Sequence, residues 1–123
     1  MAETVPSRVA SFIRDHVSSL EQLEILLWLR QHPGRACTAV EVARELRTLE
    51  SSARSRLSDL ATRGLLHGEG GAPGIAYRYV ALDAAREQVV AELDREYATH
   101  RYAVIELIFS KPLENVTVFP RER

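Results

Sequence analysis

The sequence predicts a mostly α-helical domain that carries one small β-hairpin. Along most of the chain, apolar residues recur at the three- and four-residue spacing of helices. A Gly-rich segment, 68–74, separates two short runs that suit strands. The 123 residues, 46% of them hydrophobic and 27% charged, match one globular domain with a modest core.

The N-terminal third predicts two helices, over residues 7–17 and 20–31. Ser19 and Gln22 have the S-x-x-Q spacing of a capping box, which marks the start of the second helix. Apolar side chains nearly encircle that helix, so we expect it to be buried on most sides, with Trp28 in the core. A His-Pro-Gly sequence ends it.

The central segment 38–66 predicts a helix, a short turn and a second helix. Thr38 and Glu41 form a T-x-x-E capping box, which satisfies two backbone amides at the start of the first helix. Cys37 and Val42 flank the cap at the spacing of a hydrophobic staple. This segment therefore begins with a well-marked helix.

The second helix of the segment follows a turn that we expect Leu49 to anchor. Ser51 or Ser52 can cap its start, and Gly64 suits its end because glycine readily adopts the left-handed conformation. One narrow stripe holds the apolar side chains of this helix, which are Ala53, Leu57, Leu60 and Ala61.

Two strands then form a hairpin over residues 66–81, the second of them at 77–80. Helix, turn, helix and hairpin follow one another in the order of a winged helix-turn-helix, whose second helix enters a DNA groove. The hairpin tip carries Glu69 and no basic residue. It is either a mobile loop or a segment that approaches the minor groove through its backbone.

The polar face of the second helix is the candidate DNA-binding surface. With Leu57 directed inward, a helical projection directs five side chains to solvent, namely Ser52, Ser55, Asp59, Thr62 and Arg63. A recognition helix reads bases mainly from its first turns, so Ser52, Ser55 and Arg56 are the candidates for contacts with base edges.

Other basic residues suit the phosphates, which position a protein without specifying sequence. These are Arg54 and Arg63 on the helix and Arg78, with His67, on the hairpin. The alternative is an ordinary solvated helix face. The predicted DNA-binding set is Ser51, Ser52, Arg54, Ser55, Arg56, Arg63 and Arg78.

Three segments, 43–46, 56–66 and 77–80, resemble bacterial winged-helix transcriptional regulators of the MarR/ArsR kind. The middle one contains the pattern in which a recognition helix ends in Gly-Leu and runs into the wing. The resemblance implies a sequence-specific, dimeric DNA-binding regulator. Because some winged regulators use a redox-sensing thiol, it also leaves that role open for Cys37.

A long helix is predicted over residues 83–110, with Asp83 as its cap. Such a helix has more apolar surface than a small winged domain can cover, so we expect a second copy to cover it in a twofold dimer. The alternative folds the helix back onto residues 20–29 within one chain. The predicted interface residues are Val90, Leu93, Tyr97, His100, Val104 and Leu107.

The domain organisation predicted is 1–82 for the N-terminal helices and the winged motif, 83–110 for the dimerisation helix and 111–123 for a tail. His100 is either a pH-sensitive interface group, a residue that fixes the register of the helix, or one that points to the edge of the interface. The tail contains a short strand at 116–119 or forms an arm across a partner.

The charge of the chain predicts only modest affinity for DNA. The net charge is −1, although residues 35–66 hold six arginines and four acidic residues, a local charge of +2. The phosphate contacts supply much of DNA affinity, so two copies would be needed for useful binding. The low charge, with Asp59 and Glu69, keeps open a second function, a winged-helix module that binds a protein.

No enzymatic site is expected. The four histidines are scattered without metal-ligand spacing, the serines have no evident base, and the glycines of the hairpin do not lie between a strand and a helix. We therefore expect no metal and no cofactor. No leader or membrane span is predicted either, and with a single cysteine this indicates a cytoplasmic protein.

Overall fold

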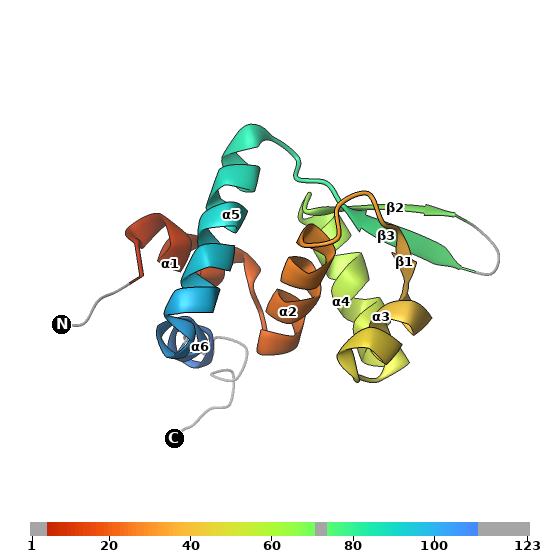
Figure 1. The fold of residues 1–123 in the computed structure, drawn as a ribbon, viewed down its shortest axis with the longest axis horizontal. Helices are drawn as coiled ribbons and strands as arrows, with labels where there is room; N and C mark the ends of the chain where they lie inside the picture. The colour runs from red at the N-terminus through yellow and green to blue at the C-terminus, as the bar shows by residue number, and fades with distance from the viewer. Residues whose placement is uncertain (1–4, 71–73, 111–123) are drawn as a thin grey trace, which may run out of the picture.

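The computed structural model describes residues 5–70 and 74–110. Figure 1 shows the elements of these ranges in order. They are α1 (Ser7–His16), α2 (Leu20–Arg30), β1 (Cys37–Thr38), α3 (Ala39–Leu46), α4 (Glu50–Thr62), β2 (Leu66–Gly70), β3 (Ile75–Tyr79), α5 (Ala84–Thr99) and α6 (Arg101–Phe109). The predicted fold class, mostly helical with a β-hairpin wing, is confirmed.

The hairpin belongs to a small antiparallel sheet in the order β1-β3-β2. Cys37 of β1 lies opposite Tyr77 of β3, and His67 of β2 lies opposite Arg78. For the described residues, the sequence predicts the two hairpin strands but not β1. Strand β1 has two residues and runs directly into the cap of α3, too short for an alternating pattern.

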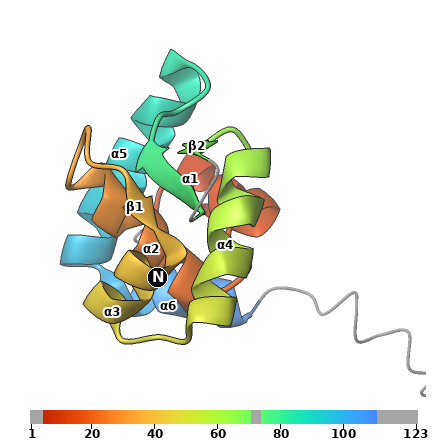
Figure 2. The ribbon, with the colours of Figure 1, turned by 90° about the vertical axis from the view of Figure 1, so that its right-hand side faces the viewer.

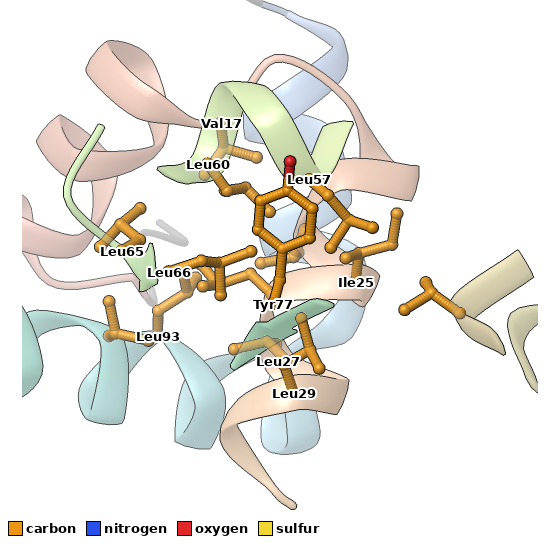
Figure 3. Close-up of a cluster of buried hydrophobic side chains, with 14 of the residues drawn as sticks. Val17, Ile25, Leu27, Leu29, Leu57, Leu60, Leu65, Leu66, Tyr77 and Leu93 are labelled. Atoms are coloured by element: carbon orange, nitrogen blue, oxygen red, sulfur yellow. The ribbon is translucent and has the colours of Figure 1, made fainter. Parts of the chain in front are cut away.

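A core of buried side chains joins the motif to α2. Figure 3 shows labelled members of this cluster converging from α2, from α4 and from the hairpin. Leu57 and Leu60 come from α4, Ile25 comes from α2, and Tyr77 comes from β3; all four are buried. This packing fixes one face of α4 inward and leaves the opposite face to solvent.

Helices α1, α5 and α6 pack together at the end of the molecule away from the hairpin (Figure 1). Arg30 of α2 ties α5 to the motif, because its guanidinium donates to Glu87 and to Asp94, each at 2.9 Å. The hydroxyl of Tyr79, at the end of β3, also donates to Glu87 at 2.6 Å. The winged motif and the three outer helices therefore form one body.

The predicted caps are confirmed in part. Thr38 and Glu41 form the complete capping box of α3. Ser19 caps α2 by accepting a hydrogen bond from the backbone of Gln22, but the Gln22 side chain does not return to Ser19. It accepts instead from Ser18, through the backbone amide at 2.6 Å and the hydroxyl at 3.0 Å.

The predicted start of α4 is wrong. The helix begins at Glu50 with Leu49 as its N-cap, and no side chain caps it. Ser51 and Ser52 lie inside its first turn, where the Ser52 hydroxyl donates to Glu21 of α2. Leu49 does not anchor the turn, since 72% of its surface is exposed. Ser52 does not act as a cap because it is already the third residue of the helix, and its hydroxyl donates to Glu21.

The predicted single helix over 83–110 is two helices. His100 breaks it with φ −131° and ψ 54°, and α6 turns back to pack on α1 and α5. His100 is exposed rather than placed among apolar residues, and its ring nitrogen lies 2.9 Å from Glu96. The predicted tail, 111–123, lies outside the described residues.

Trp28 is only half-buried. Its ring stacks on His32 with 4.3 Å between ring centroids, and the guanidinium of Arg35 lies 5.2 Å from the ring centre. Trp28 packs against the core but lies at its margin, so the predicted core position is confirmed only in part. Among the described helices, none combines the length and apolar character needed to cross a membrane.

Candidate nucleic-acid interface

Helix α4 presents a continuous polar stripe to solvent. The helix is seen beside α3 and the hairpin in Figure 2. Leu57 on its inner face is fully buried. The exposed side chains recur at three- and four-residue intervals on the opposite face, and they are Ser51, Arg54, Ser55, Ser58 and Thr62. Three of the seven predicted DNA-binding residues lie in this stripe.

Among the five side chains of this stripe, Arg54 alone carries a positive charge. Its guanidinium forms an ion pair with Glu50 one turn earlier, and 60% of the Arg54 side chain is exposed. Exposed pairs of this kind contribute little free energy, so the arginine can exchange its partner for a phosphate or a base edge at little cost. Ser51 and Ser55 beside it make no side-chain hydrogen bond within the described part of the chain.

Ser52 and Arg56 face a different direction. Both donate to the Glu21 carboxylate of α2, Arg56 through Nε at 3.0 Å, and Thr48 of the turn donates to the same carboxylate. The hydroxyls of Ser52 and Thr48, with the Arg56 guanidinium, hold the pKa of Glu21 below 4.5 against the opposing effect of burial. Two predicted base-reading residues are thus engaged within the protein.

The end of α4 is tied to the N-terminal helices. Arg63 donates to Asp59 at 2.9 Å and to the backbone carbonyl of Asp15 at 3.0 Å. Asp59 also accepts from the buried amide of Gln22 at 2.5 Å. The prediction that Asp59 and Arg63 point freely to solvent is therefore wrong, because both are half-buried between α4 and α1–α2.

His16 lies beside this cluster. Its ring is 5.0 Å from that of Phe12, and its Nδ1 lies 3.4 Å from the Arg63 guanidinium. Burial first, and then the positive charge of Arg63, lower the pKa of His16 below 6.5. The imidazole is therefore held in its neutral form near neutral pH.

A groove of about 630 Å³ separates α4 from the wing. The starts of α3 and α4 line one side, and β3 lines the other with Ile75 and Tyr77. Arg44 of α3 reaches this groove and makes no side-chain hydrogen bond among the described residues. On β3, Arg78 likewise has no such bond and is half-buried.

Arg47 completes the cations of this side. It closes α3 in the left-handed conformation, with φ 57° and ψ 51°, and its side chain is exposed. Sequence reasoning missed both Arg44 and Arg47 as candidate DNA contacts. The spacing of α3 places Arg44 on its polar face, whereas nothing in the sequence indicates the unusual backbone of Arg47.

No protein-family model and no curated protein sequence matches the chain. Solved structures do match. The fold is that of the MarR-type winged-helix proteins. A mutant of MarR from E. coli has a TM-score of 0.56 at 12% identity, over 95% of this chain and 93% of that one. A MarR family protein from Bacillus stearothermophilus has a TM-score of 0.54 at 17% identity, over 92% and 75%.

A third MarR-type structure holds nucleic acid. A mutant of MepR from S. aureus, bound to an oligodeoxyribonucleotide, has a TM-score of 0.57 at 13% identity, over 91% of this chain and 79% of that one. At these identities the likeness concerns the fold. The DNA ligand is a property of the MepR structure.

In this MarR-type fold, the six predicted dimer residues are mostly inside a single chain. Leu107 is partly buried, His100 is exposed, and four are buried without any partner copy: Val90, Leu93, Tyr97 and Val104. The alternative in which the C-terminal segment folds back within one chain therefore describes their burial better, but α5 and α6 pack chiefly on α1 and on each other. Side-chain hydrogen bonds such as that from Tyr97 to Glu24 join α5 to α2. Among the large apolar residues of α6, Tyr102 is 85% exposed and Phe109 is 69% exposed.

Proposed function

We propose that this protein is a bacterial, cytoplasmic transcriptional regulator that binds specific double-stranded DNA sequences as a homodimer. The exposed stripe of α4 carries the proposal. Ser51, Arg54 and Ser55 occupy the first turns of the second helix of the motif, which is where such helices meet base edges. The MarR-type fold supports this reading.

The side chains divide by the contact each can make. Arg54 suits a bidentate contact with guanine, and Ser51 and Ser55 suit hydrogen bonds to several bases. Four further cations suit phosphates on either side of the helix. Arg44 and Arg47 are exposed, Arg78 is half-buried, and Arg63 is held at the end of α4.

The proposed dimer uses α6 rather than the buried residues of α5. Tyr102 and Phe109 lie seven residues apart and so project from one side of the helix, with the partly buried Ile105 between them. Large exposed aromatic residues at this spacing favour a helix from a second copy. A twofold dimer would present two α4 helices to successive turns of DNA.

The test begins with selection of an operator from a random duplex pool. The binding constant of the wild-type protein for that operator is then compared with those of Arg54→Ala and Arg95→Ala. Arg95 is an exposed arginine on α5 and is the matched control. We expect Arg54→Ala to lose about 10-fold or more in affinity, and Arg95→Ala to lose little.

Light scattering on the same samples tests the dimer. We expect wild-type protein to be dimeric and the Tyr102→Glu, Phe109→Glu double variant to be monomeric and folded. Absence of wild-type binding even at low salt would overturn the DNA-binding proposal. A monomeric wild type would overturn the homodimer.

One observation favours a second candidate function, a module that binds a protein. In the groove beside α4, Glu41 and Glu50 alternate with Arg44 and Arg54, and the exposed apolar side chain of Ile75 lies beside them. Mixed charges around apolar surface suit a peptide better than a polyanion. A dimer that binds no DNA would favour this function, and a pull-down would then identify the partner.

A further inference from the structure

Glu21 of α2 contacts both the turn and the second helix of the helix-turn-helix. Its carboxylate, in the first turn of α2, accepts hydrogen bonds from Thr48 in the turn and from Ser52 and Arg56 of α4. The two oxygens of an ionised carboxylate can accept all three donors. Side chains from two elements thus converge on one charge of a third.

The contact divides α4 into two polar sides. Ser52 and Arg56 lie one turn apart and both turn toward α2, whereas Ser51, Arg54 and Ser55 stay exposed. The Arg56 side chain is 34% exposed and that of Glu21 is 27% exposed, so solvent screens the pair only in part. A charge-assisted hydrogen bond in such a setting is stronger than one between freely exposed groups.

We propose that Glu21 is a positioning residue that determines DNA specificity, because it keeps Ser52 and Arg56 away from DNA and fixes which side of α4 is presented. This inference rests on the proposed DNA-binding function. It assigns base reading to Ser51, Arg54 and Ser55 and removes Arg56 from the contact surface.

Loss of the Glu21 charge should change the affinities for non-specific DNA and for the operator in opposite directions. A freed Arg56 would reach a phosphate of any sequence, which strengthens non-specific binding and makes its salt dependence steeper by about one counterion. A less firmly oriented α4 would at the same time lose contacts with its own operator. The ratio of specific to non-specific affinity therefore falls when Glu21 loses its charge.

The experiment measures binding of full-length protein to the selected operator and to a random duplex across a salt series. The variants are Glu21→Gln, Arg56→Gln, the double variant, and Glu45→Gln. Glutamine at position 21 still accepts hydrogen bonds from the hydroxyls, so we expect the fold to be retained. Glu45 is an exposed acid of α3 without a side-chain partner in the described residues, and it controls for the loss of one negative charge.

We expect Glu21→Gln to bind the random duplex several-fold more tightly, with the steeper slope, and to lose discrimination more than Glu45→Gln does. Arg56→Gln alone should leave random-duplex binding unchanged, and in the double variant it should return that binding to the wild-type level. Loss of random-duplex affinity in Arg56→Gln, or unchanged discrimination in Glu21→Gln, would overturn the proposal. Arg56→Gln keeps the test valid even if Glu21→Gln does not fold.

A measurement that needs no DNA distinguishes failure of the role proposed for Glu21 from failure of the proposed DNA-binding function. The Nε–Hε resonance of Arg56 should exchange slowly with water in the wild type and in Glu45→Gln, and rapidly in Glu21→Gln. If the wild type binds no DNA, the proposed function and this specificity role fail together. If it binds DNA but the resonance does not respond to Glu21→Gln, only the role of Glu21 fails.

Discussion

The side-chain amide of Gln22 in α2 donates a hydrogen bond of 2.5 Å to Asp59 in α4. Gln22 is 1% exposed, and its amide oxygen accepts from Ser18. We predict that Gln22→Ala lowers the free energy of unfolding by about 2–3 kcal/mol, because it leaves a cavity and removes the buried partner of Asp59. Urea denaturation measures the change.

The matched control is Gln31→Ala. Gln31 follows the same helix and also donates to an aspartate, Asp94 at 3.1 Å, but it is exposed. We expect this variant to lose less than about 1 kcal/mol. Equal losses in the two variants would show that burial of the Gln22 amide adds nothing to stability.

Alanine substitutions at three glycines distinguish the cost of backbone strain from the cost of a steric clash. Gly64 has φ +77°, and an added Cβ would lie 3.1 Å from the Cβ of Leu82. Gly34 has φ +83° with open space around it, and Gly74 has open space without a positive φ. Replacement by alanine should cost most at Gly64, about 1 kcal/mol at Gly34, and close to nothing at Gly74. Thermal unfolding of the three variants tests this order, which a loss at Gly74 equal to that at Gly64 would contradict.

Arginine to glycine should have opposite effects inside α3 and at the residue that closes it. Arg47 incurs a steric penalty in the left-handed conformation that glycine does not, so Arg47→Gly should stabilise the fold by about 0.5–1 kcal/mol. Arg44 lies inside the helix, where Arg44→Gly should destabilise by about 1 kcal/mol. Chemical denaturation of both variants checks the sign, and destabilisation by Arg47→Gly would refute the argument.

Stability should fall on acidification in two stages. The pKa of His16 is lowered from 6.5 by burial and by Arg63, so the folded state resists a proton that the unfolded state binds, and stability declines as the pH falls below 6.5. The pKa of Glu21 is lowered from 4.5, chiefly by the Ser52 hydrogen bond. Its contribution is complete above about pH 4.5 and is lost as the pH falls through the folded value.

Unfolding free energies measured from pH 8 down to about pH 2 test both stages. His16→Gln should remove the decline that begins near 6.5, and Glu21→Gln should reduce the decline below 4.5. An unchanged upper stage in His16→Gln would assign that decline to other groups. Glu87 adds to the lower stage: burial opposes its ionisation, but the hydrogen bonds from Tyr79 and Arg30 hold its pKa below 4.5.

The sequence predicted the features that depend on neighbouring residues. The capping box of Thr38 and Glu41, the buried stripe of α4 and the stop at Gly64 are set within a few positions of the chain, and all three are present. The wing could be predicted for the same reason, since glycines separate its two strands.

Partners distant in the chain could not be read from a helical projection. Ser52 and Arg56 lie on the polar side of α4, as expected, but their direction is decided by Glu21, more than thirty residues earlier. The break at His100 was hidden because apolar spacing continues across it, from Tyr97 to Val104, while both helices bury their residues in one core. The DNA-binding set itself stays a prediction.

Cys37 is the single cysteine of the chain, its surface is fully buried where β1 pairs with β3, and burial raises the pKa of its thiol. A labelling reagent can therefore reach this sulfur only when the edge of the sheet opens. The rate at which Cys37 is labelled under native conditions therefore reports the equilibrium for local opening of the sheet at β1 and β3, without any engineered probe. A rate that follows the global unfolding free energy would show that the wing and the helices open as one unit.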